Sequence, residues 1–319
     1  MQTTGRIGEG KMRISRFGGI IAAASKSVAQ PMLQIGTIPI IKRIVITYQQ
    51  AGIFPIVVIT GKDEEEVKHQ LSSYGVIFLQ VESPEQPELM DSVRVGMEYL
   101  YNKCERIVFT PVNVPMFTPA TLLSLMDVEG EVVVPSFEHR GGHPVIVHND
   151  IVPRILSYEG SDGLRGAFAE GMVDRVFVEV ADKGVLSSVS DEKGLEQQLS
   201  EHNSSILKPV LHMQLEKEIP FFNVRLKILL FLIDDTENVK LSCQRSGLAY
   251  SKAWDMINTL EQNLGFAVVK RNHGGQDGGS TVLTWKGRSF LAAYQQFEEQ
   301  LQRTAQTEFY SRFVSTNIL

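Results

Sequence analysis

Two loops in the first half of the chain are candidates for ligand binding. One follows an apolar run at 17–22 and consists of small residues, which allow backbone amides to approach a phosphate closely. Its candidate residues are Ala22, Ala23, Ala24, Ser25 and Lys26. The other follows an apolar run at 106–110 and places Asn113 between two prolines. Each loop alone also fits an ordinary turn, because small residues and asparagine are frequent in turns that bind nothing.

Basic and polar side chains form a second candidate group near the end of the chain, and their chemistry suits DNA. Segments 240–246 and 251–264 have helical periodicity and are joined at Gly247, a residue type that favours the end of a helix. One face of the second segment is apolar at Trp254, Ile257 and Leu260, and the other is polar. Two short helices of this kind predict a helix-turn-helix, although an ordinary helical hairpin has the same pattern.

The segment that follows favours the helix-turn-helix. Two strand-like runs flank a glycine-rich loop at 274–279, which predicts a hairpin wing, although such a loop could also hold an anion. Basic residues at the base of a wing suit DNA phosphates, and polar residues on the second helix suit the groove. The predicted DNA-binding residues are Arg245, Ser251, Lys252, Asp255, Thr259, Lys270 and Arg271.

Histidine and cysteine residues give little support for a metal centre. His139, His143 and His148 lie close together in the sequence, but no acidic or cysteine residue shares their spacing. We therefore expect His148 to be structural and no histidine metal site. Cys104 and Cys243 are far apart and fit two reduced thiols rather than a disulfide framework.

Most of the first 180 residues alternate strand-like apolar runs with helical segments. Strand-like runs occur at 17–22, 56–60, 76–81, 106–110, 132–134, 144–148 and 175–180. Segments of helical period occur at 40–48, 92–101, 118–126 and 162–170. This alternation predicts an α/β, Rossmann-like fold, a mostly parallel sheet with helices on both faces. Ligands of such sheets bind beyond the carboxyl ends of the strands, where both candidate loops would lie.

Composition and charge restrict the classes of protein to which the chain can belong. The 319 residues are enough for two domains, and no apolar run approaches the ~18 residues that a membrane span needs. The first residues lack the apolar core of a secretion signal, so we expect a cytoplasmic protein with no membrane partner. The net charge is −6, yet residues 221–303 carry roughly ten basic against eight acidic side chains. An acidic body with a mildly basic C-terminal part predicts two functions in one chain.

The motifs of the first 200 residues, taken in order, resemble the MobA-like nucleotidyltransferases of molybdenum-cofactor biosynthesis, which join a nucleotide to a pterin. Segment 21–41 resembles the family's opening loop, of the type LAAGxSxRMGxxKxLLxLxGxPLL. Segments 91–96, 112–117, 140–145 and 184–186 resemble its S-x-R-x-G, G-D-x-P, R-x-G-H-P-V and G-V-L motifs. Besides the first loop, the ligand-binding residues that this resemblance implies are Ser92, Arg94, Asn113, Arg140 and His143.

Several residues that this family uses for nucleotidyl transfer are replaced. Transfer needs Mg²⁺ on the triphosphate and a cation beside the phosphates. The family's metal-binding aspartates fall on Asn113 and Ser188, its loop lysine on Gln30 and its loop glycine on Ala24, which leaves Lys26 as the one cation in the loop. We therefore predict that catalysis is lost and that the domain binds a nucleotide or a molybdopterin-type molecule. Mg²⁺ and GTP or CTP would be needed if transfer were retained.

The C-terminal third resembles the DNA-binding domain of ModE-like regulators of molybdate metabolism. Segment 250–254 resembles the start of their recognition helix, and 274–288 resembles their wing and the helix after it. Helical periodicity at 286–303 and an apolar run at 221–233 predict long flanking helices. Those regulators dimerise through such helices, so the resemblance implies a homodimer on a palindromic operator.

These observations predict two domains and a regulatory function. The predicted domains are 1–200 for the nucleotidyltransferase fold, 201–220 for a linker, and 221–319 for a small winged helix-turn-helix. The linker falls in a serine-rich and proline-punctuated stretch. The leading hypothesis is a DNA-binding transcriptional regulator of molybdenum or molybdopterin metabolism with a degenerate effector domain. The alternatives are an active molybdenum cofactor nucleotidyltransferase with an attached DNA-binding domain, and a dimer scaffold without a ligand.

Overall fold

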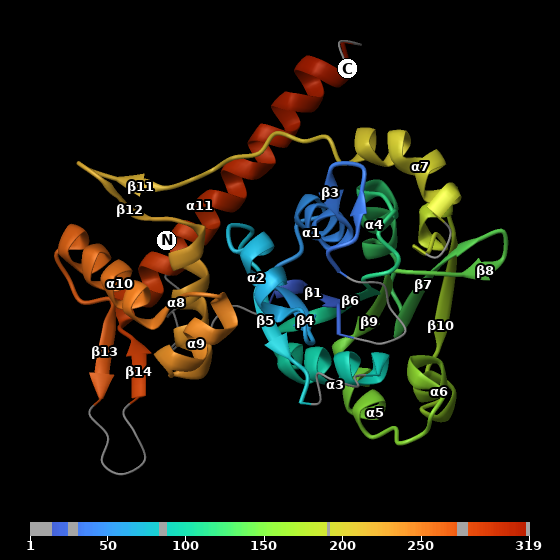
Figure 1. Ribbon diagram of the computed structural model, residues 1–319, viewed down its shortest axis with the longest axis horizontal. Coiled ribbons are helices and arrows are strands. Elements are labelled where there is room, and N and C mark those ends of the chain that lie inside the picture. The colour runs from blue at the N-terminus through green and yellow to red at the C-terminus, as the bar shows by residue number, and fades with distance from the viewer. Residues whose placement is uncertain (1–14, 25–30, 83–87, 190–191, 273–279, 317–319) are drawn as a thin grey trace, which may run out of the picture.

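An eight-stranded sheet forms the centre of the N-terminal part of the chain (Figure 1). The computed structural model describes residues 15–24, 31–82, 88–189, 192–272 and 280–316. The strands are β1 (Ser15–Ala22), β4 (Ile56–Thr60), β5 (Ile77–Gln80), β6 (Cys104–Pro111), β7 (Val132–Phe137), β8 (Arg140–Gly141), β9 (Val145–His148) and β10 (Arg175–Glu179). Their order is β10-β7-β9-β6-β1-β4-β5, with β8 paired to β7.

Most neighbouring strands are parallel, and the predicted α/β class is confirmed. β9 runs antiparallel to both β6 and β7, and β8 runs antiparallel to β7. The remaining pairs, β1 with β4 and β6, β4 with β5, and β7 with β10, are parallel. Each strand-like run of the first 180 residues became a strand. Both faces of the sheet are covered at its centre, so nearly every residue of β1 and β4 is buried.

Helices cover both faces of the sheet. One face carries α1 (Ile40–Gln50), α2 (Glu64–Leu71) and α4 (Pro119–Met126), and the other carries α3 (Leu89–Leu100), α5 (Val152–Leu156) and α6 (Gly163–Glu170). Short elements complete this unit, a β2 (Gln34–Ile35) and β3 (Ile38–Pro39) hairpin and the single turns η1 (Asn149–Ile151) and η2 (Lys183–Val185). Helix α2, which the sequence analysis missed, is mostly charged and buries only Val67 and Leu71.

Helix α7 (Glu192–Ser205) occupies the stretch just before and at the start of the expected linker. It packs on the α1 face through Leu195 and His202, which are 3% and 2% exposed. Arg43 of α1 is also buried, and its Nη1 lies 3.3 Å from His202 Nδ1 and donates to Asn203 Oδ1 over 2.8 Å. Burial and then the nearby Arg43 charge lower the pKa of His202 to about 4. A neutral imidazole can therefore accept the hydrogen bond from the guanidinium.

A connection with little regular structure leads to the C-terminal unit. It contains the two-stranded pair β11 (Leu215–Glu216) and β12 (Pro220–Phe222). Lys208 in this connection donates from Nζ to the Ile46 carbonyl over 3.4 Å, and burial lowers the pKa of Lys208 to about 8. Tyr294 Oη donates to the Met213 carbonyl over 2.9 Å. The connection is thus tied to both units.

The C-terminal unit consists of four helices and a two-stranded hairpin. The helices are α8 (Val224–Thr236), α9 (Val239–Ser246), α10 (Tyr250–Leu264) and α11 (Trp285–Phe309), which continues into η3 (Tyr310–Val314). The hairpin pairs β13 (Val269–Asn272) with β14 (Ser280–Leu283). Side-chain caps from Asn223, Asn238 and Thr284 start α8, α9 and α11, and Gly247 ends α9 in the left-handed conformation.

Glu261 joins α10 to the hairpin. It lies on the otherwise apolar face of the helix, and its Oε1 accepts hydrogen bonds from Val268 N over 2.7 Å and from Val269 N over 3.0 Å. Two backbone donors at the start of β13 are satisfied in this way, so the hairpin is held at a fixed place beside α10.

The two units pack against each other along the β5 side of the sheet. Phe54 lies edge-on to Phe231 of α8, with ring centroids 5.2 Å apart, and α9 contacts β5. Lys103 Nζ lies 3.2 Å from Asp235 Oδ1 at the end of α8. A cavity of about 980 Å³ remains between α2, β5 and α3 on one side and α8 and α9 on the other. Among the described residues, no helix is long and apolar enough to cross a membrane.

Candidate functional site

Most predicted site residues of the N-terminal unit lie at the edge of the sheet where the parallel strands have their carboxyl ends. β1 and β6 are neighbours and end at the paired residues Ala22 and Pro111, so the loops after them are adjacent. β9 runs antiparallel to β6, so the residues before β9 reach the same edge. Helix α3 begins there because it returns from β5 to β6. The residues brought to this edge are Ala22, Ala23, Ala24, Ser92, Asn113, Arg140 and His143.

Asn113 and Ser188, the two positions predicted to have lost an aspartate, face each other. Asn113 Nδ2 donates to Ser188 Oγ over 3.4 Å, and Val189 N donates to the Asn113 carbonyl over 3.0 Å. Asn113 Oδ1 is buried and accepts no hydrogen bond from the residues that the structure describes. The fold therefore joins two segments that are far apart in the sequence, but at their meeting point it places an amide and a hydroxyl.

Asp182 holds the segment that contains Ser188 in place. Its Oδ2 accepts from Thr118 N over 2.8 Å and from Thr121 Oγ1 over 2.7 Å, both at the start of α4. Its Oδ1 accepts from Gly184 N over 2.8 Å. This carboxylate is used within the fold, and the sequence analysis had not singled it out because its partners are distant in the chain.

Two glycines allow the motif segments to approach closely. A side chain at Gly142 would place Cβ 2.3 Å from the Val185 carbonyl oxygen, and one at Gly184 would place Cβ 2.1 Å from the Met116 carbonyl oxygen. Neither backbone could give way easily, because both lie in buried parts of the unit. The glycines of the R-x-G-H-P-V and G-V-L segments thus serve packing between the loops that surround Asn113.

His143 contributes shape to the site and no positive charge. Its ring lies edge-on to Phe109, with centroids 6.0 Å apart, and its backbone N donates to the Val185 carbonyl over 2.9 Å. Burial lowers the pKa of His143 to about 4, so the imidazole is neutral near pH 7. Arg140, on β8, is exposed at the same edge and carries the nearest charge along this loop.

The two predicted ligand residues of α3 lie in different surroundings. Ser92 is fully buried, and its Oγ has no hydrogen-bond partner among the described residues. Arg94 instead donates to the Leu156 carbonyl over 2.8 Å and to the Tyr158 carbonyl, which joins α3 to the end of α5. Arg94 therefore has a structural task that its position in the motif did not reveal.

The remaining residues of the first loop lie outside the part of the chain that the structure describes. They are Ser25, Lys26 and Gln30. Their predicted roles stay predictions.

A divalent cation does not fit the described residues at this edge. Mg²⁺ takes oxygen ligands, usually with one or two carboxylates, but Asn113 and Ser188 carry no charge and both Asp182 oxygens are already bonded. Nowhere in the described ranges do three or more histidine, cysteine, aspartate or glutamate residues form a group that could hold a metal ion. The three clustered histidines diverge: His139 is exposed, His143 is enclosed, and His148 Nδ1 lies 3.4 Å from Asp150 Oδ2.

Family comparison agrees with this fold. Residues 15–176 match the model of the MobA-like NTP transferase domain. The chain belongs to the MobA-like NTP transferase family. The match includes β1, the Asn113 loop and the R-x-G-H-P-V segment, and it ends before the segment that carries Ser188.

A solved structure supports the nucleotidyltransferase fold of the N-terminal unit. A nucleotidyl transferase from Methanothermobacter thermautotroptrophicus aligns with a TM-score of 0.51 and 19% identity, over 58% of this chain and 98% of that one. Rv0371c from Mycobacterium tuberculosis H37Rv aligns with a TM-score of 0.49 and 19% identity, over 58% of this chain and 100% of its own.

One curated relative is similar over a short stretch. It is the molybdenum-pterin-binding protein MopB of Rhodobacter capsulatus, which is 36% identical over 66 residues, 21% of this chain and 24% of that protein. The chain thus spans about a quarter of the length of the curated relative that it matches.

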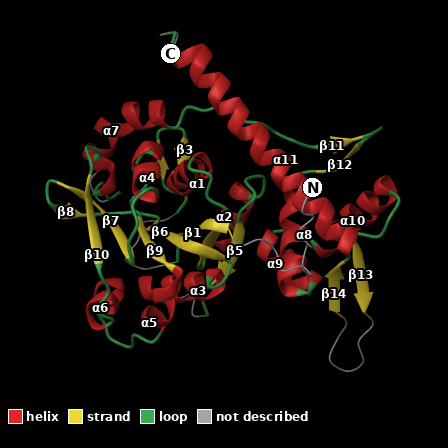
Figure 2. Ribbon diagram, turned by 180° about the vertical axis from the view of Figure 1, so that it is seen from behind, coloured by secondary structure: helices red, strands yellow, loops and turns green. Residues whose placement is uncertain are grey.

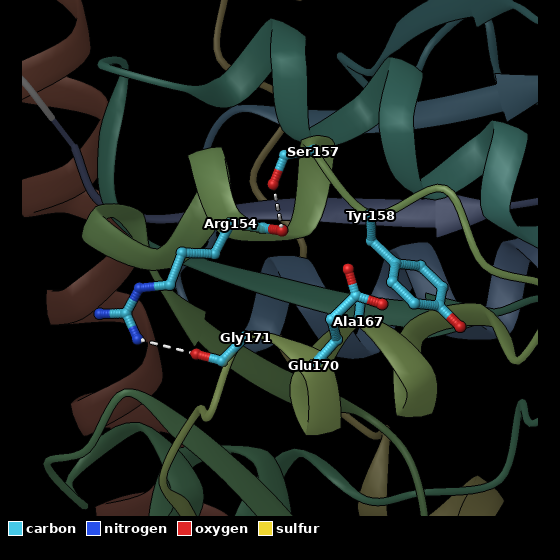
Figure 3. Close-up of a pocket in the computed structure, with 6 residues that line it drawn as sticks. All are labelled: Arg154, Ser157, Tyr158, Ala167, Glu170 and Gly171. Carbon is cyan, nitrogen blue, oxygen red and sulfur yellow. Dashed lines mark hydrogen bonds between the residues drawn. The ribbon is translucent and has the colours of Figure 1, made fainter.

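A small cavity elsewhere in the MobA-like unit is not part of this site. It has a volume of about 140 Å³ and lies between α5 and α6 (Figure 3). Arg154 points toward Gly171 there, and its Nη1 donates to the Gly171 carbonyl over 3.3 Å. None of the predicted site residues lines it, so it gives no reason to move the candidate site.

The predicted DNA-contacting residues, apart from Arg245, lie on α10 and β13. These two elements are on the side of the C-terminal unit away from the MobA-like sheet in both views (Figures 1 and 2). Ser251, Lys252 and Asp255 are exposed on α10, and Thr259 is half-buried. Lys270 and Arg271 are exposed on β13.

Arg245 lies apart from this group, at the contact between the two units. Its guanidinium carbon lies 5.1 Å from the centre of the Tyr99 ring of α3, and its Nη1 lies 3.9 Å from Asp235 Oδ2. The sequence could not reveal this placement, because it depends on how the MobA-like unit meets α9.

Two residues of α10 that the sequence analysis did not include hold Arg271. Its guanidinium carbon lies 3.9 Å from the centre of the Trp254 ring, and its Nη2 donates to Asn258 Oδ1 over 3.3 Å. The sequence analysis placed Trp254 on the inward face of the helix. The residue is half-buried, and one ring face is covered by Arg271. An arginine at the third position of the predicted hairpin strand was the available sequence signal.

Proposed function

We propose that the protein is a DNA-binding transcriptional regulator of molybdenum or molybdopterin metabolism. Its MobA-like unit binds a nucleotide or molybdopterin-type effector without transferring it, and its C-terminal unit is a ModE-like winged helix-turn-helix. The observation that carries the proposal is the α10 and β13 surface, where polar and basic side chains are exposed away from the MobA-like unit.

The order and contacts of the C-terminal elements support DNA binding. α9 and α10 are joined by Gly247 in the left-handed conformation, and a hairpin held by Glu261 follows α10 directly. A recognition helix flanked by a wing needs this arrangement, because both must reach the same stretch of duplex. Lys252, Lys270 and Arg271 supply three positive charges on that side.

The chemistry at Asn113 supports a binding role for the MobA-like unit. The Asn113–Ser188 hydrogen bond replaces a charged metal site with a neutral contact, and transfer of a nucleotidyl group without oriented charge would lose several kcal/mol of stabilisation for each missing group. The buried Asn113 Oδ1 still offers an acceptor to a ligand N–H or O–H. A ligand bound through neutral polar contacts fits a sensor better than a transferase.

The molybdenum context rests on two similarities. MobA-like domains and the partial match to a molybdenum-pterin-binding protein point to the same area of metabolism. A homodimer is part of the proposal, since α11 exposes aromatic side chains along its outer half: Phe297 is 54% exposed, and Tyr310 in the following turn is 63% exposed. Two-fold symmetry would pair such faces and place two α10 helices on a palindrome.

Selection from a random duplex DNA library tests the DNA-binding half. We expect the full-length protein to enrich a palindromic sequence, and Lys252→Ala to weaken binding to it. Gln262→Ala, on a similarly exposed position of α10 that carries no charge, is the matched control for loss of a side chain. Failure to enrich any sequence, together with no binding to duplex DNA, would overturn the proposed function.

Calorimetry with GTP, CTP and a pterin tests the effector half. Binding of one of them, with the same affinity in Mg²⁺ and in EDTA, is the expected result. Transfer of a nucleotide to molybdopterin in the presence of Mg²⁺ would instead establish the active transferase, and absence of binding by all three would support a scaffold.

A further inference from the structure

The guanidinium of Arg271 is held between two residues of α10. Its central carbon lies 3.9 Å from the centre of the Trp254 ring, and its Nη2 donates to Asn258 Oδ1 over 3.3 Å. Tyr250 in turn packs on Trp254: its ring is edge-on to the Trp254 ring, with the centroids 6.2 Å apart. Trp254 and Asn258 are four residues apart, so they lie on the same side of the helix.

The pleat of the hairpin explains why Arg271, and not Lys270, reaches α10. Side chains alternate between the two faces of a strand, so Arg271 points to the same face as Val269, which is buried against the unit's core. Its cross-strand partner Thr281 is also buried on that face, at 8% exposure. Lys270 points to the opposite face and is exposed. The two neighbouring basic residues therefore have different environments.

We propose that Trp254 is a positioning residue that fixes Arg271 as a clamp for one DNA phosphate at the junction of α10 and the wing. This inference rests on the proposed DNA-binding function. The guanidinium has five N–H donors in a rigid plane, and one of them is used by Asn258. The free edge of the fork can bond two oxygens of one phosphate, which a lysine cannot do in the same way.

The position of Arg271 favours a phosphate over a base edge. Base contacts in helix-turn-helix proteins come from the first residues of the recognition helix, whereas Asn258 is the ninth residue of α10. Arg271 itself comes from the hairpin strand, which flanks the helix. An arginine placed beside the helix meets the sugar-phosphate backbone before it meets the groove floor.

The test uses full-length protein and a labelled mixed-sequence duplex of about 30 base pairs, since a phosphate contact is independent of sequence. Affinity is measured by fluorescence anisotropy at about 50 to 200 mM KCl. We expect Arg271→Lys to weaken binding roughly tenfold while the salt dependence stays the same, because the charge is retained. Arg271→Ala should weaken binding further and reduce the slope of log K against log salt by about one. Arg271 is exposed, so neither change threatens folding.

Trp254 is tested through its effect on that lysine substitution. In the Trp254→Ala background, we expect Arg271→Lys to lower DNA affinity less than about twofold, because the guanidinium is no longer fixed. In the Trp254→Phe background, the roughly tenfold difference in DNA affinity between arginine and lysine should return. A Trp254 that only stabilises the fold would leave the difference between arginine and lysine unchanged, and that result would overturn the inference. Equal binding by wild type and Arg271→Lys would also overturn it while leaving DNA binding intact. No binding of duplex by the wild type would refute the proposed function itself.

Discussion

Restoring the two missing carboxylates should make the protein depend on a divalent cation. Asn113 Nδ2 and Ser188 Oγ are 3.4 Å apart, so Asn113→Asp with Ser188→Asp would put two carboxylates within about 4 Å of each other. Two like charges at that distance repel by about 4 kcal/mol at an effective dielectric constant of about 20, and proton uptake would relieve a part of this. Without a cation, the double variant should lose roughly 2 to 4 kcal/mol of stability.

Thermal unfolding provides the assay. For domains of about 150 to 250 residues, 1 kcal/mol corresponds to about 2 to 4 °C in Tm, so we expect the double variant in EDTA to melt roughly 4 to 16 °C below the wild type. Mg²⁺ or Mn²⁺ at about 100 times its Kd would return about 2.7 kcal/mol, most of the loss. The wild type should melt at the same temperature in EDTA and in Mg²⁺, because its site holds a neutral amide and hydroxyl.

A surface control separates the local effect from a change of net charge. Asn102→Asp with Ser73→Asp adds the same two charges at exposed positions and should show neither the loss nor the rescue. The reasoning fails if the wild-type Tm rises saturably with Mg²⁺, or if the double variant of the site is as stable in EDTA as the control variant.

Three further perturbations test other parts of the structure. The pKa of His202 is lowered to about 4, so the unfolded chain binds more protons than the folded chain between pH 6.5 and 4, and stability is lost as the pH falls through that window. His202→Gln should remove up to about 3 kcal/mol of this loss. Identical urea midpoints for the two proteins at every pH would contradict this prediction. Phe231→Ala should lower the free energy of unfolding, measured by chemical denaturation, by about 3 to 5 kcal/mol, because Phe231 is 5% exposed and packs on Phe54. Trp285 is 72% exposed, so the control variant Trp285→Ala should change that free energy by about 0.5 kcal/mol or less. Gly184→Ala should cost at least about 2 kcal/mol, since its Cβ would lie 2.1 Å from the Met116 carbonyl oxygen, and an unchanged Tm would show that the segment can move.

Periodicity made the sheet and most of its helices predictable. The strand-like runs at 17–22 and 56–60 became β1 and β4, because residues buried on both sides must be apolar throughout. α2 and α7 were missed for the opposite reason. α2 buries only Val67 and Leu71, and among the α7 side chains that the structure describes only Leu195 and His202 are buried, so little periodic signal marks either helix. α7 is held by His202 against Arg43, a contact between residues that are distant in the sequence.

The motifs indicated which residues belong to the candidate site, but not which contacts each of them makes. Ordered motifs identified Asn113 and Ser188, and the fold placed them within hydrogen-bonding distance. Arg94 and Arg245 were assigned by motif and by charge, yet one bonds backbone carbonyls and the other meets Tyr99 across the contact between units. Nor could the position of Arg271 on Trp254 be read from spacing, because strand pleat and helix packing together determine it.

The contact between the two units determines whether either unit is stable without the other. β5 is the last strand of the sheet on its side, and such a strand presents unpaired backbone groups that invite aggregation. α9 lies against β5, and one continuous apolar core includes residues of the α3 face of the sheet together with Leu226, Leu229 and Phe231 of α8. The sequence analysis predicts two domains, and the two units of the structure each cover a surface that the other would otherwise expose. Removal of the C-terminal unit would therefore expose the β5 edge together with apolar surface of the shared core, and the shortened protein should aggregate.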